Sequence, residues 1–502
     1  MDHLESAYAM AVLLGGFALL TLLAIRGHSI FVVAPLCALV ILIFSGHDPL
    51  TGMTGDYMQG FVEYLKPFYL IFALGAAFGK LMETSGAAAT IARNVVRLWG
   101  PKRACLSVVL ACAVLTYGGV SLFVVGFSVY PLAVQLFREA NLPRRFIPAA
   151  MALGSVTFTM TTAGSPEIQN LIPMKYLIDD VTQEPLTDAR AGWPASLIVS
   201  AVMFALGQVY LEWALRRDLS RGARFEPRAD DLPATVKSES TENDTTGNDS
   251  AEYDRAVPAK VAPPLWAAIA PLLVTLLALN LLPRVLPQLG NAWERWLSTP
   301  DGGNHVASRV SSLLKWFPED PTLAIFLGMI AGLLTLWKFI RSAWQPLGEG
   351  FVNGLVAIGS TCSVVGFGAA IRNLPAFERL IEWVTHLPGD PLFGAAVAVA
   401  VIAGLAGSAS GGQGLALPII KPIYIDQLGV APRALHRVVA IASGSLDTLP
   451  ANGYLVMLIR NVCGDTHARC YWPICVTCTI IPAFGTILAI LLFKLVPAWG
   501  TM

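Results

Sequence analysis

The chain has 502 residues, of which 55% are hydrophobic and only 14% charged, and its mean hydropathy is +0.61. Soluble domains carry about 25% charged residues. The apolar residues also come in long runs, so a large soluble core is excluded and an all-α polytopic membrane protein with lipid around it is predicted. The formal net charge is zero, so no nucleic-acid partner is expected.

Eight cysteines are scattered along the chain. Cys475 and Cys478 form a lone CxxC inside an apolar run, with no second pair to complete a metal site. This pattern favours packed thiols. We therefore expect no metal and no cofactor.

About twelve hydrophobic segments follow one another in chain order. In the first half they lie near 8–25, 29–45, 62–82, 104–137, 147–173 and 193–215, and in the second half near 265–283, 322–340, 350–373, 391–425, 434–458 and 472–496. The segments 104–137 and 391–425 are too long for one span of ~20 residues. Both contain a small-residue break, YGGVS at 117–121 and GSASGGQG at 407–414. Each predicts a helical hairpin that turns inside the protein, or two tightly joined spans.

Residues 216–264 separate the two halves. This stretch begins with five arginines and continues as the polar, acidic run DLPATVKSESTENDTTGNDSAEYD. Such a composition cannot bury a core, so it predicts a disordered linker, and the arginines favour a cytoplasmic one. The chain then divides into a first transmembrane repeat, 1–215, and a second, 265–502.

The two halves resemble each other. GAAFGKLMETSGAAATIA from Gly75 is similar to GAAIRNLPAFERLI from Gly368, and each expected hairpin leads to a Pro-Arg pair, at 143–144 and 432–433. The positive-inside rule places both termini outside and the linker inside. With six segments per half and a fourth segment that returns to its own side, the repeats are inverted, as in many alternating-access carriers.

Two segments at membrane depth are interrupted. Residues 153–173 and 440–458 each contain a Gly/Ser/Thr/Pro cluster and an acid, Glu167 in the first and Asp447 in the second. In hydrocarbon, every backbone N–H and C=O must be bonded internally, so a broken helix is tolerated only where it lines a cavity or is buried in protein. A pair of interrupted segments in corresponding positions points to a substrate site at the midplane.

The chemistry of each break predicts how it works. In the first, we expect a helix to stop near Gly164 and a new one to restart at Ser165–Pro166, whose free N–H groups would bind an anion without a buried cation. The alternative is a packing kink in which Ser and Thr bond back to the helix. In the second, Asp447 through Pro450 would cap and restart a helix. Asp447, and Glu167 as its rival, are candidates to couple a proton or Na⁺, and a purely structural cap is the alternative for each.

The candidate substrate-binding residues are small or polar and lie at the two hairpin breaks and in the two interrupted segments. They are Gly118, Gly119, Ser121, Thr161, Thr162, Gly164, Ser165, Pro166, Gln169, Asn170, Ser408, Ser410, Gly411, Gly412, Gln413, Ser443, Gly444, Ser445, Thr448 and Asn452. Glycine lets backbone approach a ligand, and the hydroxyl and amide side chains supply adaptable hydrogen bonds.

Three motifs carry a resemblance to a known family. GSPEIQNLIP at 164–173, GSLDTLPANG at 444–453 and CGDTH at 463–467 resemble the gluconate permease (GntP-type) family, and within it D-3-hydroxybutyrate permease-like members. The resemblance covers most of the chain outside the linker. It implies proton-coupled uptake of small organic acids by an ion-transporter type of fold in the bacterial inner membrane. Two departures are Ala451, where relatives often have histidine, and the longer, more acidic linker.

We therefore expect a secondary active transporter that imports a small organic carboxylate such as 3-hydroxybutyrate or gluconate. A Na⁺-coupled transporter of citrate, dicarboxylates or short-chain fatty acids is the alternative. An intramembrane enzyme is disfavoured because the interrupted segments contain no histidine and the chain has no HExxH motif. A channel would not need two half-helix anion sites. The sequence leaves the oligomeric state open, with a homodimer as a candidate.

Overall fold

Helices account for every named element of the fold. The computed structural model describes residues 3–26, 28–100, 103–228, 262–297, 321–340, 342–377, 379, 389–450 and 452–502. Within these ranges, five helices are long and apolar enough to cross a membrane, and six shorter apolar helices accompany them. The chain is thus a multi-pass, all-helical protein.

The first half is built from the following helices, where η marks short 3₁₀ or π turns: α1 (His3–Ile25), α2 (Ile30–Phe44), α3 (Pro49–Thr51), η1 (Gly52–Tyr57), α4 (Met58–Thr84), α5 (Ala87–Trp99), α6 (Ala104–Tyr117), α7 (Leu122–Glu139), η3 (Arg144–Phe146), α8 (Ile147–Ala152), η4 (Leu153–Thr157), α9 (Ile168–Tyr176) and α10 (Trp193–Ser220). Helix α5 was not among the expected segments. It buries only one face, which includes Ile91 and Ala92, so its average hydropathy is low.

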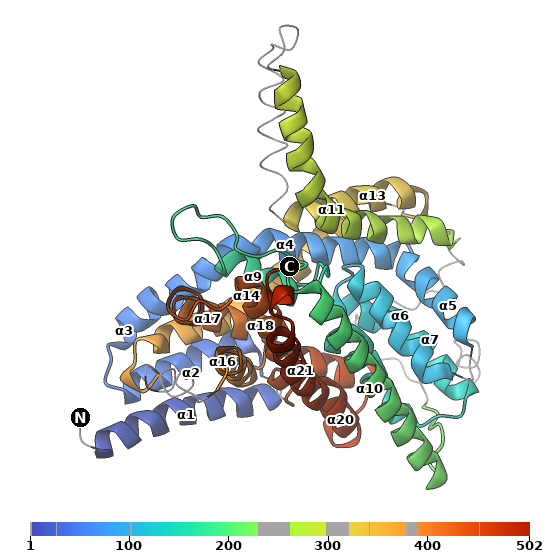
Figure 1. Cartoon of the computed structure of the whole chain (residues 1–502). Coiled ribbons are helices and arrows are strands. Elements are labelled where there is room, and N and C mark those ends of the chain that lie inside the picture. Colours follow the sequence, from blue (N-terminus) through green and yellow to red (C-terminus); the bar gives the residue numbers. More distant parts are fainter. Residues whose placement is uncertain are drawn as a thin grey trace.

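The second half contains α11 (Leu265–Leu297), α13 (Pro321–Leu336), η8 (Trp337–Phe339), α14 (Trp344–Arg372), α16 (Pro391–Ala406), α17 (Ala409–Lys421), η9 (Pro422–Gln427), α18 (Pro432–Leu446), α19 (Gly453–Val456), η10 (Met457–Val462), α20 (His467–Cys475), η11 (Val476–Ile480), α21 (Ile481–Leu495) and η12 (Pro497–Gly500). Figure 1 shows α18 and α21 in the middle, between α1, α2 and α16 on one side and α6, α7 and α10 on the other.

Both over-long segments are pairs of helices. Helices α6 and α7 pack against each other, and so do α16 and α17. The chain turns at Gly119, with φ +89°, and at Gly407, with φ +61°. Glycine reaches these left-handed conformations without steric cost. The two expected breaks therefore lie at the turns.

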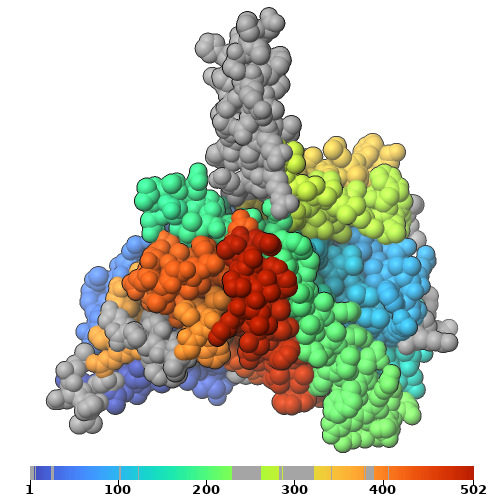
Figure 2. Space-filling view, viewed as in Figure 1, coloured from blue at the N-terminus to red at the C-terminus, as the bar shows by residue number. Residues whose placement is uncertain are grey.

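The end of the first half continues further than expected. Helix α10 runs to Ser220, and residues 221–228, the first part of the predicted linker beyond this helix, return to contact the second half. The rest of that linker, residues 229–261, lies outside the described residues, as does Ala451. At the other end of α10, the amide of Gly192 donates to the carbonyl oxygen of Met502 at 2.8 Å. In Figure 2 the C-terminal segment (red) accordingly lies against the green segment around residue 200.

Candidate functional site

The two interrupted segments cross at the centre of the molecule. A Cβ atom placed on Gly444 in α18 would lie 3.5 Å from Oε1 of Gln169 in α9 and 3.9 Å from the methyl group of Thr161. From the hairpin α16–α17, the Gln413 amide donates to the Gln169 carbonyl at 3.1 Å and to the Ser443 hydroxyl at 2.7 Å. One side chain thus joins the second hairpin to both interrupted segments.

The first break restarts later than its sequence predicted. Helix α9 begins at Ile168, and the residue before it is Glu167, whose side chain makes no cap bond. Other parts of the chain hold residues 163–166 instead. The backbone amide of Gly164 donates to the Ala189 carbonyl at 2.7 Å. The side-chain amide of Asn170 donates to the carbonyls of Ser165 and Ala189, each at 2.8 Å. The helix thus restarts two residues later than the expected Ser165–Pro166, with Glu167 and not Ser165 before its first residue, because the loop after α9 binds the Gly164 amide.

The second break also differs from the expected cap. Helix α18 ends at Leu446, so Asp447 lies at its C-terminal end, and α19 begins at Gly453 behind Asn452. The Asn452 side chain accepts from the Leu455 amide at 2.9 Å and is the real N-cap. We had expected Asp447 to cap the restarted helix of its own segment, and it does not. Its carboxylate accepts instead from the Ala409 amide at 3.2 Å, at the N-terminus of α17.

Buried basic side chains on α18 support the irregular backbone. Arg437 is fully buried and donates to the carbonyls of Thr161, Ala191 and Ala189, the second at 2.9 Å. These oxygens lie in or beside the first break, where no helix bonds them. The neighbouring His436 contacts Asn170 and Thr187. The segment is therefore tolerated at membrane depth because side chains of the second half replace its missing helical bonds.

A cavity of about 410 Å³ lies beside the crossing. Its polar wall comes from the second hairpin turn, the second break and α9, and its other walls come from α1, α2 and α14. Among the described residues that line it, Asp447 is the one acid and His28 the one basic side chain, with no lysine or arginine. The N-terminus of α17 is therefore the main positive feature on this wall.

Five of the residues singled out in the sequence line this cavity: Gln169, Ser408, Ser410, Asp447 and Asn452. The remaining candidates are not among its lining residues; these are Gly118, Gly119, Ser121, Thr161, Thr162, Gly164, Ser165, Pro166, Glu167, Asn170, Gly411, Gly412, Gln413, Ser443, Gly444, Ser445 and Thr448. Several of them instead connect the elements that surround the cavity. Thr448, for example, donates to the Cys478 carbonyl at 2.7 Å, and the first hairpin turn packs Gly119 against Pro166.

Sequence reasoning missed part of the cavity wall. Thr21 and His28, near the α1–α2 turn, and Ser360 and Thr361 on α14 come from segments that show no interruption. From the sequence alone, a single hydroxyl in a long apolar helix does not show whether its side of the helix faces a cavity. Arg437 was also missed, although a basic residue deep in an apolar segment is a functional or structural signal in its own right.

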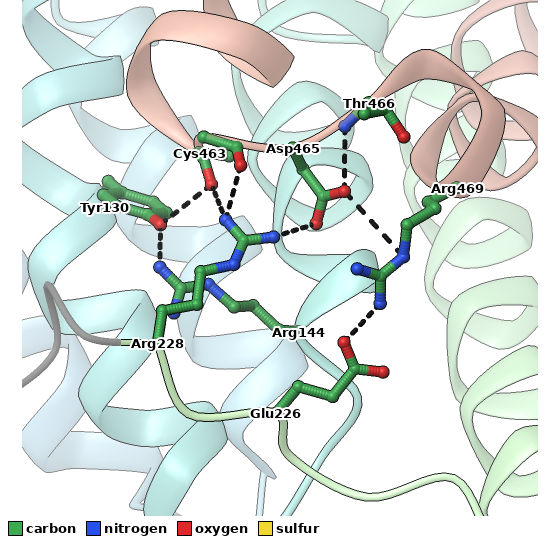
Figure 3. A network of polar contacts seen from close by, with 9 residues as sticks. Tyr130, Arg144, Glu226, Arg228, Cys463, Asp465, Thr466 and Arg469 are labelled. Carbon is green, nitrogen blue, oxygen red and sulfur yellow. Dashed lines mark hydrogen bonds and ion pairs between the residues drawn. The ribbon is translucent and has the colours of Figure 1, made fainter.

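The motif at 463–467 belongs to a second polar cluster, away from the cavity (Figure 3). Arg228 donates to the carbonyls of Cys463 and Gly464 at 2.7 Å and to Asp465 at 2.6 Å. From the first half, Tyr130 donates to the Cys463 carbonyl at 3.1 Å. Arg144 donates in turn to the Tyr130 hydroxyl. This cluster joins the start of the linker, the middle of α7 and η3 to the second half.

Comparison with known proteins decides the family. Residues 8–205 match the sequence model of the GntP family permeases. The "Uncharacterized transporter YxjC" of Bacillus subtilis (strain 168) is 34% identical over 92% of this chain and 94% of its own length. The chain belongs to the GntP permease family. It is accordingly a transporter and not an enzyme.

Two more distant relatives of this GntP permease are also named as permeases. The "Gluconate permease" of Zymomonas mobilis is 22% identical over 87% of both chains, and a protein of the same name from Pseudomonas aeruginosa is 28% identical over 41% of this chain and 46% of its own. Among solved structures, the YdaH transporter of Alcanivorax borkumensis, described as having an unusual topology, superposes with a TM-score of 0.50 at 15% identity and covers 90% of each chain. This likeness concerns the fold alone.

Proposed function

We propose that this GntP permease is a secondary active importer of a small organic hydroxycarboxylate, such as 3-hydroxybutyrate or gluconate, in the bacterial inner membrane. It works by proton symport, with alternating access between two inverted repeats. The observation that carries the proposal is a cavity that brings an acid and a helix N-terminus together between the interrupted segments. The gluconate permease names of two relatives support the substrate class.

The size and polarity of the cavity suit such a substrate. A volume of about 410 Å³ lies at the lower end of ligand pockets and holds a small acid. The α17 N-terminus offers donors for a carboxylate, and Ser408, Ser410 and Asn452 offer groups for hydroxyls. A dicarboxylate would bring a second negative charge into a cavity whose described wall contains neither lysine nor arginine, so a monocarboxylate fits better.

Asp447 is our preferred coupling residue. It lines the cavity, whereas Glu167 does not. Its carboxylate also accepts from the Ala409 amide at the N-terminus of α17, so a proton on Asp447 and a bound substrate would act at the same place. Na⁺ coupling, the alternative, would need several oxygen ligands around the ion.

An uptake panel tests the proposal. The purified protein in proteoliposomes would be offered labelled gluconate, D-3-hydroxybutyrate, acetate and citrate under an imposed pH gradient or an imposed Na⁺ gradient. We expect accumulation of a hydroxymonocarboxylate with the pH gradient alone. Accumulation that requires Na⁺ would favour the alternative, and transport of none of these acids would reject the proposed function.

A further inference from the structure

The carboxylate of Asp447 sits where an anionic ligand would be expected. Asp447 follows the C-terminal end of α18, where the helix dipole disfavours a negative charge, and contacts the first amide of α17, where the dipole favours one. Helix α17 has 13 residues. Its first-turn N–H groups have no partner within the helix, and the third of them, on Gly411, is already taken by the Ser408 hydroxyl at 3.2 Å.

Unused hydrogen-bonding atoms mark this place as a ligand site. Asp447 accepts from Ala409 and from Asn452 at 3.4 Å through Oδ2, and the adjoining Thr448 amide also lies near its carboxylate. Among the described residues, no hydrogen-bond partner reaches its Oδ1 or the buried Oε1 of Gln169. Both side chains are less than a tenth exposed and line the cavity. Buried acceptors of this kind are costly unless a proton or a ligand donor satisfies them.

We propose that Asp447 is an internal stand-in for the substrate. Its carboxylate occupies the N-terminus of α17 when the cavity is empty, and the substrate carboxylate takes that place once a proton from the aqueous side has neutralised Asp447. The Ala409 N–H then donates to the substrate instead of to Oδ2. Release of the substrate on the other side frees the amide, and Asp447 gives up its proton there and returns.

This inference rests on the proposed function, and it makes the coupling between proton and substrate obligatory. Two carboxylates cannot share one helix N-terminus in a cavity whose described wall contains neither lysine nor arginine, so the anion enters with a proton and not alone. The titratable groups that face this region are Tyr454 on α19, Tyr471 on α20, Cys478 on η11 and His28 near the α1–α2 turn. None of the four carries a carboxyl group.

The test is the pH dependence of KM for gluconate and D-3-hydroxybutyrate exchange between preloaded proteoliposomes and medium. Both acids stay ionised from about pH 6 to 8, as carboxylic acids do. For the unchanged protein we expect KM to rise with pH, towards a limit of about tenfold per pH unit for one competing carboxylate. Asp447→Asn should show a low KM that does not change with pH and should lose accumulation driven by a pH gradient.

Two further variants keep the inference falsifiable. Asp390→Asn makes the same change at the N-terminus of α16, where Asp390 accepts from the Leu392 amide at 2.9 Å outside the cavity, and should keep the pH slope. Ala409→Pro replaces the shared N–H by a ring carbon, at the first position of α17, where proline suits a helix, and should raise KM about tenfold or more at every pH.

Three results would overturn the inference. They are an Asp447→Asn protein with the pH slope of the unchanged protein, an Ala409→Pro protein with unchanged KM, and an unchanged protein whose KM does not depend on pH. Failure of the unchanged protein to exchange either acid would overturn the proposed function itself, which is a different observation. Amounts of folded protein are compared by size-exclusion profile before each assay.

Discussion

Asp447 and Arg437 are single charged residues inside apolar segments whose hydrogen-bond partners lie far away along the chain. An acid in an interrupted apolar segment is unusual enough to be noticed from the chain alone. Its partner could not be predicted, because the Ala409 amide lies 38 residues away on another element. The same holds for Arg437, whose acceptors lie about 250 residues or more away along the chain. The sequence shows that such a charged residue lies in an apolar segment, but only the tertiary packing shows which groups it hydrogen-bonds.

Replacing Arg437 by methionine should destabilise the protein strongly. The change would leave the carbonyls of Thr161 and Ala191 without their buried donor, at about 1–3 kcal/mol for each group that finds no other partner. The Ala189 carbonyl would keep its bonds from Gly164 and Asn170. Arg433→Met is the matched control on the same helix: Arg433 is about one-third exposed and pairs with Asp188 at 3.2 Å, an interaction worth about 0–1 kcal/mol. Thermal unfolding in detergent compares the two, and equal losses would show that Arg437 is not the support of the break.

At the scale of elements, the sequence predicted the kind of structure better than its boundaries. Both over-long segments are helix pairs with a turn at the expected glycines, and both acid-containing segments are broken. The residue before each restarted helix shifted from Ser165 to Glu167 and from Asp447 to Asn452. Local capping rules assume that a free amide is capped by its nearest side chain. Here, the Ala189 carbonyl in the loop after α9 accepts from the Gly164 amide, and the Ala409 amide in the second hairpin donates to Asp447. Partners that are distant along the chain therefore replace the nearest side chains.

The tightness of the second hairpin can be tested with one methyl group. A Cβ atom on Gly412 would lie 2.4 Å from the backbone of Ala403 in α16, and backbone cannot move aside as a side chain can. We expect Gly412→Ala to lower the unfolding temperature and the yield of folded protein, with a cost of about 1–3 kcal/mol from overpacking. Gly75→Ala in α4 meets nothing within 4 Å and should be neutral or slightly stabilising. Equal behaviour of the two variants would mean that α16 and α17 are not packed this closely.

The first break and the second hairpin turn make opposite predictions about where the substrate binds. Ser408 lines the cavity, whereas Ser165 is fully buried and its hydroxyl accepts from the Glu167 amide at 3.3 Å. Ser408→Ala should therefore raise the KM for the transported acid several-fold, by about the 0.5–1.5 kcal/mol of a hydrogen bond. Ser165→Ala should alter KM by less than about twofold. The reverse order would move the carboxylate site back to 164–166, as the sequence suggested.

At the scale of the whole molecule, the all-helical membrane fold and the family follow from composition and from the three motifs. The contact between the C-terminus and the start of α10 does not. The C-terminus bonds to the start of α10 through Gly192, while the root of the linker follows the other end of α10. A helix of 28 residues is about 42 Å long, enough to cross a bilayer. The C-terminus and the linker root therefore lie at opposite ends of one long apolar helix.

This arrangement turns the positive-inside argument into a labelling experiment with an internal control. Ser220, at the end of α10, and Thr501, beside its start, are both exposed, and each would be replaced by cysteine after the eight native cysteines have been removed. Because arginines flank Ser220, we expect its cysteine to react with a membrane-impermeant maleimide only after the cells are permeabilised, and the cysteine at 501 to react in intact cells. Labelling in the opposite pattern would invert the orientation but keep α10 as a span. Labelling of both from the outside would contradict the span itself, since it would place the two ends of α10 on one side of the membrane.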